Sequence, residues 1–262
     1  MSNFEIYAQS IDDATLAYSA TEDTGFPITN MQDRNIQTFF KDSTIAAATV
    51  NLVIDFGAAR ACDSIVLGNY IATAALRANL TLEAHSADAW VGAQTELFAD
   101  QDIHTATLLD DQISFGSQSF RYWRLVFDDA IGGDLTDLQF GTIFLGTHWN
   151  WAHEPELTLL EESGHDVTIN RAAGGSTYSQ IANTTVRRKW NIPLEYIVAA
   201  EKTKHETFRD TIFPGDDLSR YPYYWSNDNG TTLYYSRYQG RLSLEQQAYQ
   251  VWKANHVFVE EL

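Results

Sequence analysis

The sequence contains a single cysteine, Cys62, among its 262 residues. A disulfide within the chain is therefore excluded, and so is a metal site built from several thiolates. Cys62 stands beside a predicted core strand, where a buried and unreactive thiol is the expected state. The fold must be held together by packing of apolar surface instead of by covalent cross-links.

Basic residues are also scarce, with 17 lysines and arginines against 35 aspartates and glutamates. The imbalance is strongest in residues 1–147, which carry 20 acidic and 6 basic side chains and a net charge of −14. Binding of nucleic acid depends mainly on lysine and arginine neutralising phosphates. We therefore expect no nucleic-acid partner, even for residues 119–129, "SFRYWRLVFDD", where arginines alternate with aromatics.

Long apolar runs are missing as well, and no stretch approaches the roughly 20 residues that a membrane-spanning helix needs. The N-terminal "MSNFEIYAQS" lacks a basic region followed by an apolar core, so we expect no signal peptide. Hydrophobic residues nevertheless make up 44% of the chain and aromatics 13%, which is ample for a packed interior. The composition predicts a globular protein without membrane insertion.

Short alternating runs bounded by turn residues fill the first half of the chain, and helical periodicity is almost absent there. The clearest runs are residues 50–57, 62–69, 78–86 and 120–129. Such a series is typical of a β-sandwich or jelly roll. The predicted fold class is mainly β, with a jelly-roll domain over residues 1–147.

The composition changes at residues 147–164, where aromatics, histidines and a proline gather, and we place the domain boundary there. Residues 199–213 contain good helix formers that end at "PGDD". Residues 221–246 predict a hairpin that turns at "NDNG". Residues 148–262 are therefore expected to form a smaller α+β domain.

The run at residues 120–129 is predicted to be a central strand, because both of its faces are largely apolar. Arg124 interrupts one of these faces and would need a carboxylate partner if it is buried. Asp55 interrupts the apolar run of residues 50–57 in the same way. We predict that Asp55 and Arg124 form a structural ion pair inside the sheet.

Motifs for catalysis and metal binding are missing from the sequence. His148 and His153 are five residues apart, whereas a helical pair of zinc ligands is spaced by four, and neither a P-loop nor a G-x-S-x-G motif occurs. Acidic pairs at 110–111, 128–129 and 216–217 can ligate calcium, although solvated turns are the simpler interpretation. We predict no enzyme, no catalytic residue and no bound metal, with loop calcium left open.

Two aromatic clusters, "HWNWAH" and "YPYYW", can be carbohydrate platforms, subunit contacts or core. As interaction residues we predict the rings of these clusters: Trp149, Trp151, Tyr221, Tyr223, Tyr224 and Trp225.

Residues 27–43, 50–67, 120–127 and 138–146 carry a resemblance to a known family. In their order and spacing they resemble the discoidin, or coagulation-factor C-type, jelly rolls of the galactose-binding-like superfamily. Many of its members close the domain with a terminal disulfide, which this chain cannot form. The resemblance implies ligand-binding loops at one end of the roll, and Arg34, Tyr70 and Trp90 mark their expected positions.

Residues 165–262 resemble, in the layout of their elements, a module that recurs in bacteriophage tail proteins. The two resemblances together predict a non-enzymatic virion structural protein of a tail or tail tip, made in the host cytoplasm. Its partners would be other tail proteins, copies of itself and a host-surface glycan. The alternative is a stand-alone carbohydrate-binding protein. A glycoside hydrolase component is ranked after it.

Overall fold

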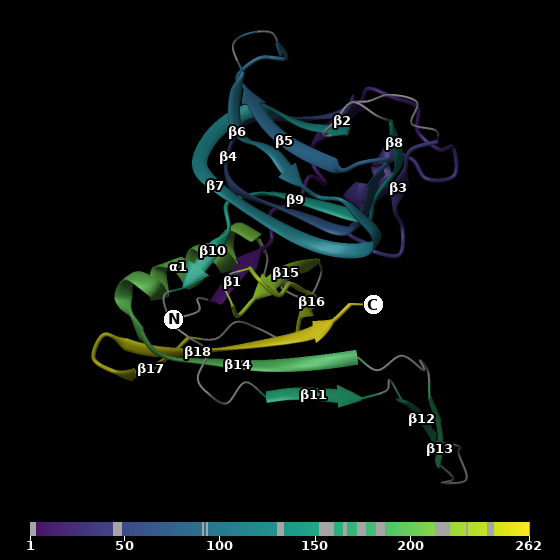
Figure 1. Cartoon of the computed structure of the whole chain (residues 1–262). Coiled ribbons are helices and arrows are strands. Elements are labelled where there is room, and N and C mark those ends of the chain that lie inside the picture. The colour runs from purple at the N-terminus through teal and green to yellow at the C-terminus, as the bar shows by residue number, and fades with distance from the viewer. Residues whose placement is uncertain are drawn as a thin grey trace. The chain divides into compact units, whose positions relative to one another are not determined.

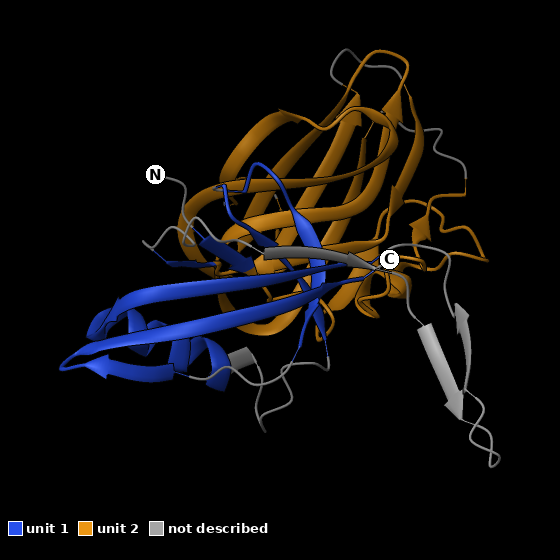
Figure 2. Cartoon of the chain, turned by 90° about the horizontal axis from the view of Figure 1, so that it is seen from below, with its two compact units in different colours: residues 1–6, 149–262 blue, residues 7–148 orange. Residues whose placement is uncertain are grey.

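The structure is a computed structural model. It describes residues 4–43, 49–90, 92, 94–129, 134–151, 160–164, 167–171, 177–181, 187–212, 221–228, 230–239 and 244–261. The fold is mainly β, and the chain divides into two compact units (Figure 2). Unit 2 comprises residues 7–148, and unit 1 comprises residues 149–262 together with residues 1–6. The predicted first domain also included residues 1–6, and by its contacts this segment lies in unit 1 instead.

Unit 2 is built around two long antiparallel strands, β4 (Thr49–Ala74) and β7 (Thr105–Asp129). Both curve round the unit in Figure 1. The remaining elements are shorter: β2 (Thr15–Tyr18), the 3-10 helix η1 (Ile28–Gln32), β3 (Phe40–Lys41), β5 (Ala78–His85), β6 (Thr95–Asp102), β8 (Leu135–Phe140) and β9 (Thr142–Gly146). The strand order is β3-β8-β4-β7-β5-β6, and β2 and β9 also pair with β4.

The two halves of β4 have different neighbours. Residues 52–55 pair with β2, whereas residues 64–68 pair with β9 and residues 71–74 with β8. Shifts in the β4–β7 register lie between these halves, and Gly57 has a φ of 72° there. Bulges bend a strand and increase its twist. The two halves of β4 can therefore pair with different neighbours within one continuous strand, whereas the sequence suggests two strands joined by a turn.

The core of unit 2 follows from period-2 alternation. Leu52 and Ile54 of β4, Leu82 of β5, and Trp123 and Leu125 of β7 are all buried. The segment 120–129 is the predicted central strand, because β7 pairs with β4 on one side and with β5 on the other. Its second face is only half-buried, which corrects the expectation of apolar cover on both sides.

The described residues of unit 1 form an eight-stranded antiparallel sheet, the two-stranded sheet β12–β13 and one α-helix. Its elements are β1 (Phe4–Tyr7), β10 (Trp149–Trp151), β11 (Leu160–Gly164), β12 (Val167–Arg171), β13 (Thr177–Ile181), β14 (Arg187–Val198), α1 (Ala199–Ile212), β15 (Pro222–Ser226), β16 (Tyr234–Tyr238), β17 (Leu244–Ala248) and β18 (Val251–Glu260). The strand order is β10-β1-β15-β16-β18-β14-β11, with β17 paired to β18. The predicted helix is α1, and the predicted hairpin is the β15–β16 pair.

Aromatic side chains dominate the core of unit 1. The Trp225 ring centroid lies 5.2 Å from that of Trp190 and 5.1 Å from that of Phe258. Two histidines, His205 of α1 and His256 of β18, are also fully buried in this core. Within the part of the chain that the structure describes, no helix is both long and apolar enough to cross a membrane.

Candidate functional site

Two of the three residues expected in ligand loops serve the fold of unit 2. Tyr70 is 1% exposed, and its ring stacks on Phe140 with 6.1 Å between the centroids. The Arg34 guanidinium donates hydrogen bonds to Asp12 over 2.8 Å and to Ser10 over 3.1 Å. Its cation also lies 5.6 Å from the Phe144 ring centroid. These contacts leave neither side chain presented to a ligand.

The third residue, Trp90, is partly exposed in the connection between β5 and β6. The Arg124 guanidinium lies over its indole ring, 4.6 Å from the centroid. The indole Nε1 donates a hydrogen bond to Asp88 Oδ1 over 2.7 Å. A cation–π contact and a hydrogen bond thus fix the orientation of the ring.

Arg124 pairs with Glu83 and not with Asp55, which corrects the predicted pair. Its Nε donates to Glu83 Oε2 over 2.6 Å, and a second nitrogen contacts the same oxygen. Asp55 instead accepts two hydrogen bonds from Arg121, of 2.7 and 2.8 Å. Glu83 is directly opposite Arg124 in the β5–β7 register, whereas Asp55 is opposite Tyr122. A directly opposed residue is nearer than a diagonal one, so Glu83 takes the cation.

The polar side chains near Trp90 gather on one face of the sheet. Gln94 Nε2 donates to Glu83 Oε1 over 3.5 Å, while Gln94 Oε1 is buried without a hydrogen-bond partner among the described residues. The His85 ring lies 6.4 Å from the Trp90 ring. We call the surface made by Glu83, His85, Trp90, Gln94 and Arg124 the Trp90 face. It combines an aromatic ring with a guanidinium, a carboxylate, an amide and an imidazole.

A second ion pair joins Arg121 of β7 to Asp55 of β4. The Arg121 guanidinium holds the pKa of Asp55 below its usual value by hydrogen bonding, against a smaller opposing effect of burial. The same guanidinium lies 4.7 Å from the Tyr122 ring centroid. Arg121 and Arg124 therefore each bind one carboxylate and one aromatic ring, and these contacts hold both arginine side chains in place.

The aromatic clusters predicted as contact surfaces mostly lie inside unit 1. Trp151 is 1% exposed, and Tyr223, Tyr224 and Trp225 are fully buried. Trp149 is half-buried against Phe208 of α1, with 5.3 Å between the ring centroids. Of the six predicted interaction residues, Tyr221 is the exposed one, at 39%. The four buried rings form core, which corrects the expectation of surface contacts.

The sequence did hold a signal for this burial. Every residue of β15 from Pro222 to Ser226 is buried, so the strand is covered on both faces. On one face of the strand the Tyr223 ring contacts Phe208 of α1. On the opposite face the Tyr224 ring contacts Tyr235 of the neighbouring strand β16. An unbroken run of apolar residues without alternation is typical of a strand covered on both faces. The run "YPYYW" was open to that interpretation.

Several candidate metal ligands are held by other interactions. No group of three or more histidine, cysteine, aspartate or glutamate side chains that could hold a metal ion occurs among the described residues. Asp110 accepts a hydrogen bond from the Asn69 amide over 2.6 Å. His148 bonds to Asp63 over 2.8 Å; burial alone would raise the pKa of Asp63, and the hydrogen bonds from His148 lower it below its usual value. His153 and residues 216–217 lie outside the described residues.

No family model and no curated protein matches the sequence. Among solved structures, the chain is similar to chitosan-binding module 1 of a Paenibacillus sp. IK-5 chitosanase/glucanase, with 14% identity over 53% of this chain and 99% of the module and a TM-score of 0.42. It is also similar to a CBM32 module from a family 31 glycoside hydrolase of Clostridium perfringens, with 13% identity over 54% of this chain and 99% of the module and a TM-score of 0.44.

A third similar structure is the family 32 carbohydrate-binding module of Clostridium perfringens NanJ in complex with galactose. Its identity is 15% over 56% of this chain and 99% of the module, with a TM-score of 0.40.

Proposed function

We propose that this protein is a non-enzymatic carbohydrate-binding protein that holds a glycan against the Trp90 face. The observation that carries the proposal is the partly exposed Trp90 ring, fixed by Arg124 and Asp88 beside several polar side chains. An aromatic ring offers a flat apolar surface for the C–H groups of a sugar ring, while amide and charged groups bind hydroxyls. The Trp90 face provides both, with Glu83, His85 and Arg124 on the sheet and Trp90 and Gln94 in the connection between β5 and β6.

The fixed geometry of the face favours binding. Arg124 is held by Glu83 and Trp90, so its conformation is largely set before a ligand arrives. Binding to ordered side chains loses less conformational entropy than binding to mobile ones. The Gln94 carbonyl oxygen, which has no partner within the described part of the chain, is an acceptor for a ligand hydroxyl.

The charge of the first half of the chain limits the class of glycan. Residues 1–147 have a net charge of −14, which repels acidic sugars at long range. The Arg124 cation is already neutralised by Glu83, so it offers no free positive charge to a ligand carboxylate. The proposed ligand is therefore a neutral glycan.

The tail-protein role stays a prediction. Burial of Trp151, Tyr223, Tyr224 and Trp225 removes four of the residues that were predicted to make its subunit contacts. The glycoside hydrolase role likewise stays a lesser prediction, because no observation on the described residues favours it over binding.

The test is a glycan array carrying neutral, amine-bearing and acidic oligosaccharides, probed with the full chain. We expect neutral glycans to bind and Trp90→Ala to weaken binding by about tenfold, which corresponds to ~1.4 kcal/mol. Tyr249→Ala is the matched control, because Tyr249 is an aromatic of unit 1 with 86% of its surface exposed. Circular dichroism and the melting temperature check that both variants stay folded.

Two outcomes would contradict the proposal. One is equal glycan binding by Trp90→Ala and the unmodified chain. The other is the absence of any glycan ligand together with assembly of the purified chain into rings or fibres in electron micrographs, which would favour the tail-protein role.

A further inference from the structure

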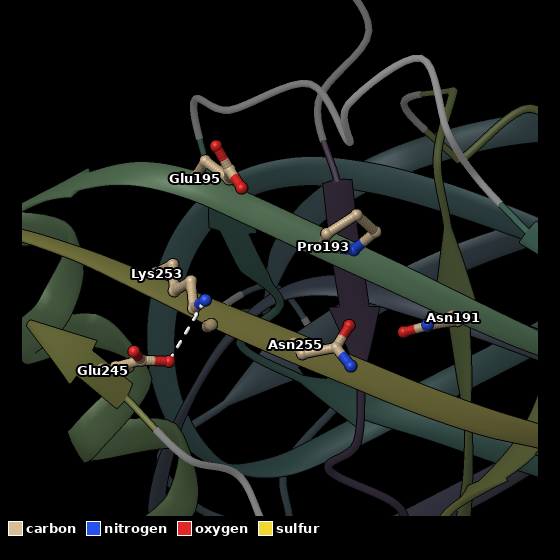
Figure 3. Close-up of a pocket in the computed structure, with 7 residues that line it drawn as sticks. Asn191, Pro193, Glu195, Glu245, Lys253 and Asn255 are labelled. Carbon is tan, nitrogen blue, oxygen red and sulfur yellow. Dashed lines mark ion pairs between the residues drawn. The ribbon is translucent and has the colours of Figure 1, made fainter. Parts of the chain in front are cut away.

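Unit 1 has an open cavity of about 330 Å³ on its sheet, separate from the Trp90 face. Strands β14, β17 and β18 form its walls (Figure 3). Six side chains labelled in that view line it: Asn191, Pro193, Glu195, Glu245, Lys253 and Asn255.

These side chains occupy the face of the sheet that points away from the core. Along β14, the buried residues Trp190, Ile192 and Leu194 alternate with Asn191 and Pro193, which are not buried. Strand side chains alternate between the two faces of a sheet, so packing of the aromatic core does not account for the polar set. The amides and carboxylates of the cavity are therefore available for another role.

Three of the polar side chains have unused hydrogen-bonding capacity. Asn191 Oδ1 is buried and has no hydrogen-bond partner in the part of the chain that the structure describes. The side chains of Glu195 and Asn255 also make no hydrogen bond or ion pair with any described residue. A buried acceptor without a partner is unfavourable, and a ligand that donates a hydrogen bond to it relieves that cost.

The charges in the cavity are unequal. Lys253 Nζ pairs with Glu245 Oε2 over 3.1 Å, which neutralises both groups. Figure 3 shows this ion pair between β18 and β17, while Glu195 extends from β14 apart from it. The cavity therefore has one carboxylate without a cation and a net charge of −1.

We propose that this cavity binds a small polyhydroxylated ligand that carries a protonated amine, an amino sugar in its simplest form. The two amides each offer a donor and an acceptor, which suits hydroxyl groups that also donate and accept. Glu195 supplies the charge for the ammonium. This site is independent of the glycan proposed for the Trp90 face, and each can exist without the other.

The test is an NMR titration of the full chain with three probes, D-glucosamine, D-glucose and D-glucuronate. We expect glucosamine to bind at least about tenfold more tightly than glucose. Glucuronate should bind most weakly, because its negative charge is repelled by the one unpaired carboxylate. The side-chain amide resonances of Asn191 and Asn255 should shift during the glucosamine titration.

Variants separate the contributions. Glu195→Gln should make glucosamine and glucose bind equally, and Asn255→Ala should weaken both, with little effect on folding because neither side chain has a partner among the described residues. Glu96→Gln, at an exposed carboxylate of unit 2, is the control and should leave the preference unchanged. Trp90→Ala should also leave the preference for glucosamine unchanged. A negative result for the cavity can therefore be told apart from a negative result for glycan binding at the Trp90 face.

The inference is overturned if saturating glucosamine leaves both asparagine side-chain resonances unmoved, which would mean that only solvent fills the cavity. It is equally overturned if the preference for glucosamine over glucose persists in Glu195→Gln.

Discussion

The two units reach a packed core by different chemistry. Unit 2 buries mostly aliphatic side chains such as Leu52, Ile65 and Leu125, and it places charged pairs on the outer face of the sheet. Among its described residues, unit 1 buries tryptophan, tyrosine, phenylalanine and two histidines beside the helix α1. Each buried ring of unit 1 contacts several other rings, so removal of one ring there deletes more packing than removal of one aliphatic side chain in unit 2. The two units should therefore respond differently to mutation and to pH.

The largest expected effect is in the aromatic core. Trp225 is fully buried, its ring lies 4.6 Å from Tyr234, and its Nε1 donates to Ser236 Oγ over 3.2 Å. Trp225→Ala should cost about 3–5 kcal/mol through the cavity that it leaves. Hydrogen exchange measured by mass spectrometry on peptides of each unit should show loss of protection in unit 1 while residues 7–148 stay protected. Equal loss of protection in both units would contradict the expectation that this variant destabilises unit 1 alone.

A smaller effect is expected from the ion pairs of unit 2. Arg124→Ala leaves Glu83, whose side chain is 9% exposed, without its cation, and it should cost about 2–3 kcal/mol. Arg121→Ala is the matched control three residues earlier on the same strand, and it should change the unfolding free energy little because that pair faces solvent. Urea denaturation of the two variants measures the difference. The same cost for both would mean that burial of Glu83 does not set the energy of its pair.

The smallest effect is expected from pH. Burial, with a further contribution from His205, lowers the pKa of His256 well below its usual 6.5. The unfolded chain then binds the proton more readily than the folded one, so the stability of unit 1 is complete above about pH 6.5 and falls as the pH drops below it. One histidine changes the free energy of unfolding by at most about 1.4 kcal/mol per pH unit.

Unit 2 should behave differently over that range. The pKa values of Asp55 and Asp63 are lowered, so their contribution is lost only as the pH falls below the usual aspartate value of 3.8. Melting temperatures of the separate transitions between pH 7 and pH 5 would test this contrast. His256→Phe should remove the pH dependence of unit 1, and persistence of that dependence in the variant would count against His256 as its source.

Local patterns were sufficient for several elements. The apolar residues on both faces of residues 120–129 predicted a central strand, and the structure confirms this position between β4 and β5. Helix formers ending at "PGDD" predicted the helix found as α1, and "NDNG" predicted the β15–β16 hairpin. These features depend on neighbours in the sequence, so they are visible in it.

The partners of charged and aromatic side chains were harder to predict. Arg124 has candidate carboxylate partners on β4 and on β5. The β5–β7 register places Glu83 directly opposite Arg124 and so selects Glu83 as the partner. "YPYYW" fits a platform as well as a core strand, and only the folded structure shows that both faces of β15 are buried, with Phe208 of α1 against Tyr223. The cavity lined by Asn191, Glu195 and Asn255 combines residues about 60 positions apart, and no local signal marks it.

Composition and local pattern are enough to predict that this protein is mainly β, has no disulfide within the chain, is strongly acidic, and has strands, a helix and a hairpin at given places. These properties follow from composition and from interactions within a few residues. The tertiary structure alone decided which carboxylate neutralises each arginine, which aromatic rings are buried, and where unpaired polar groups converge. Those outcomes depend on strand register and packing between distant segments, because the energies of ion pairs and buried rings are set by neighbours that only folding brings together.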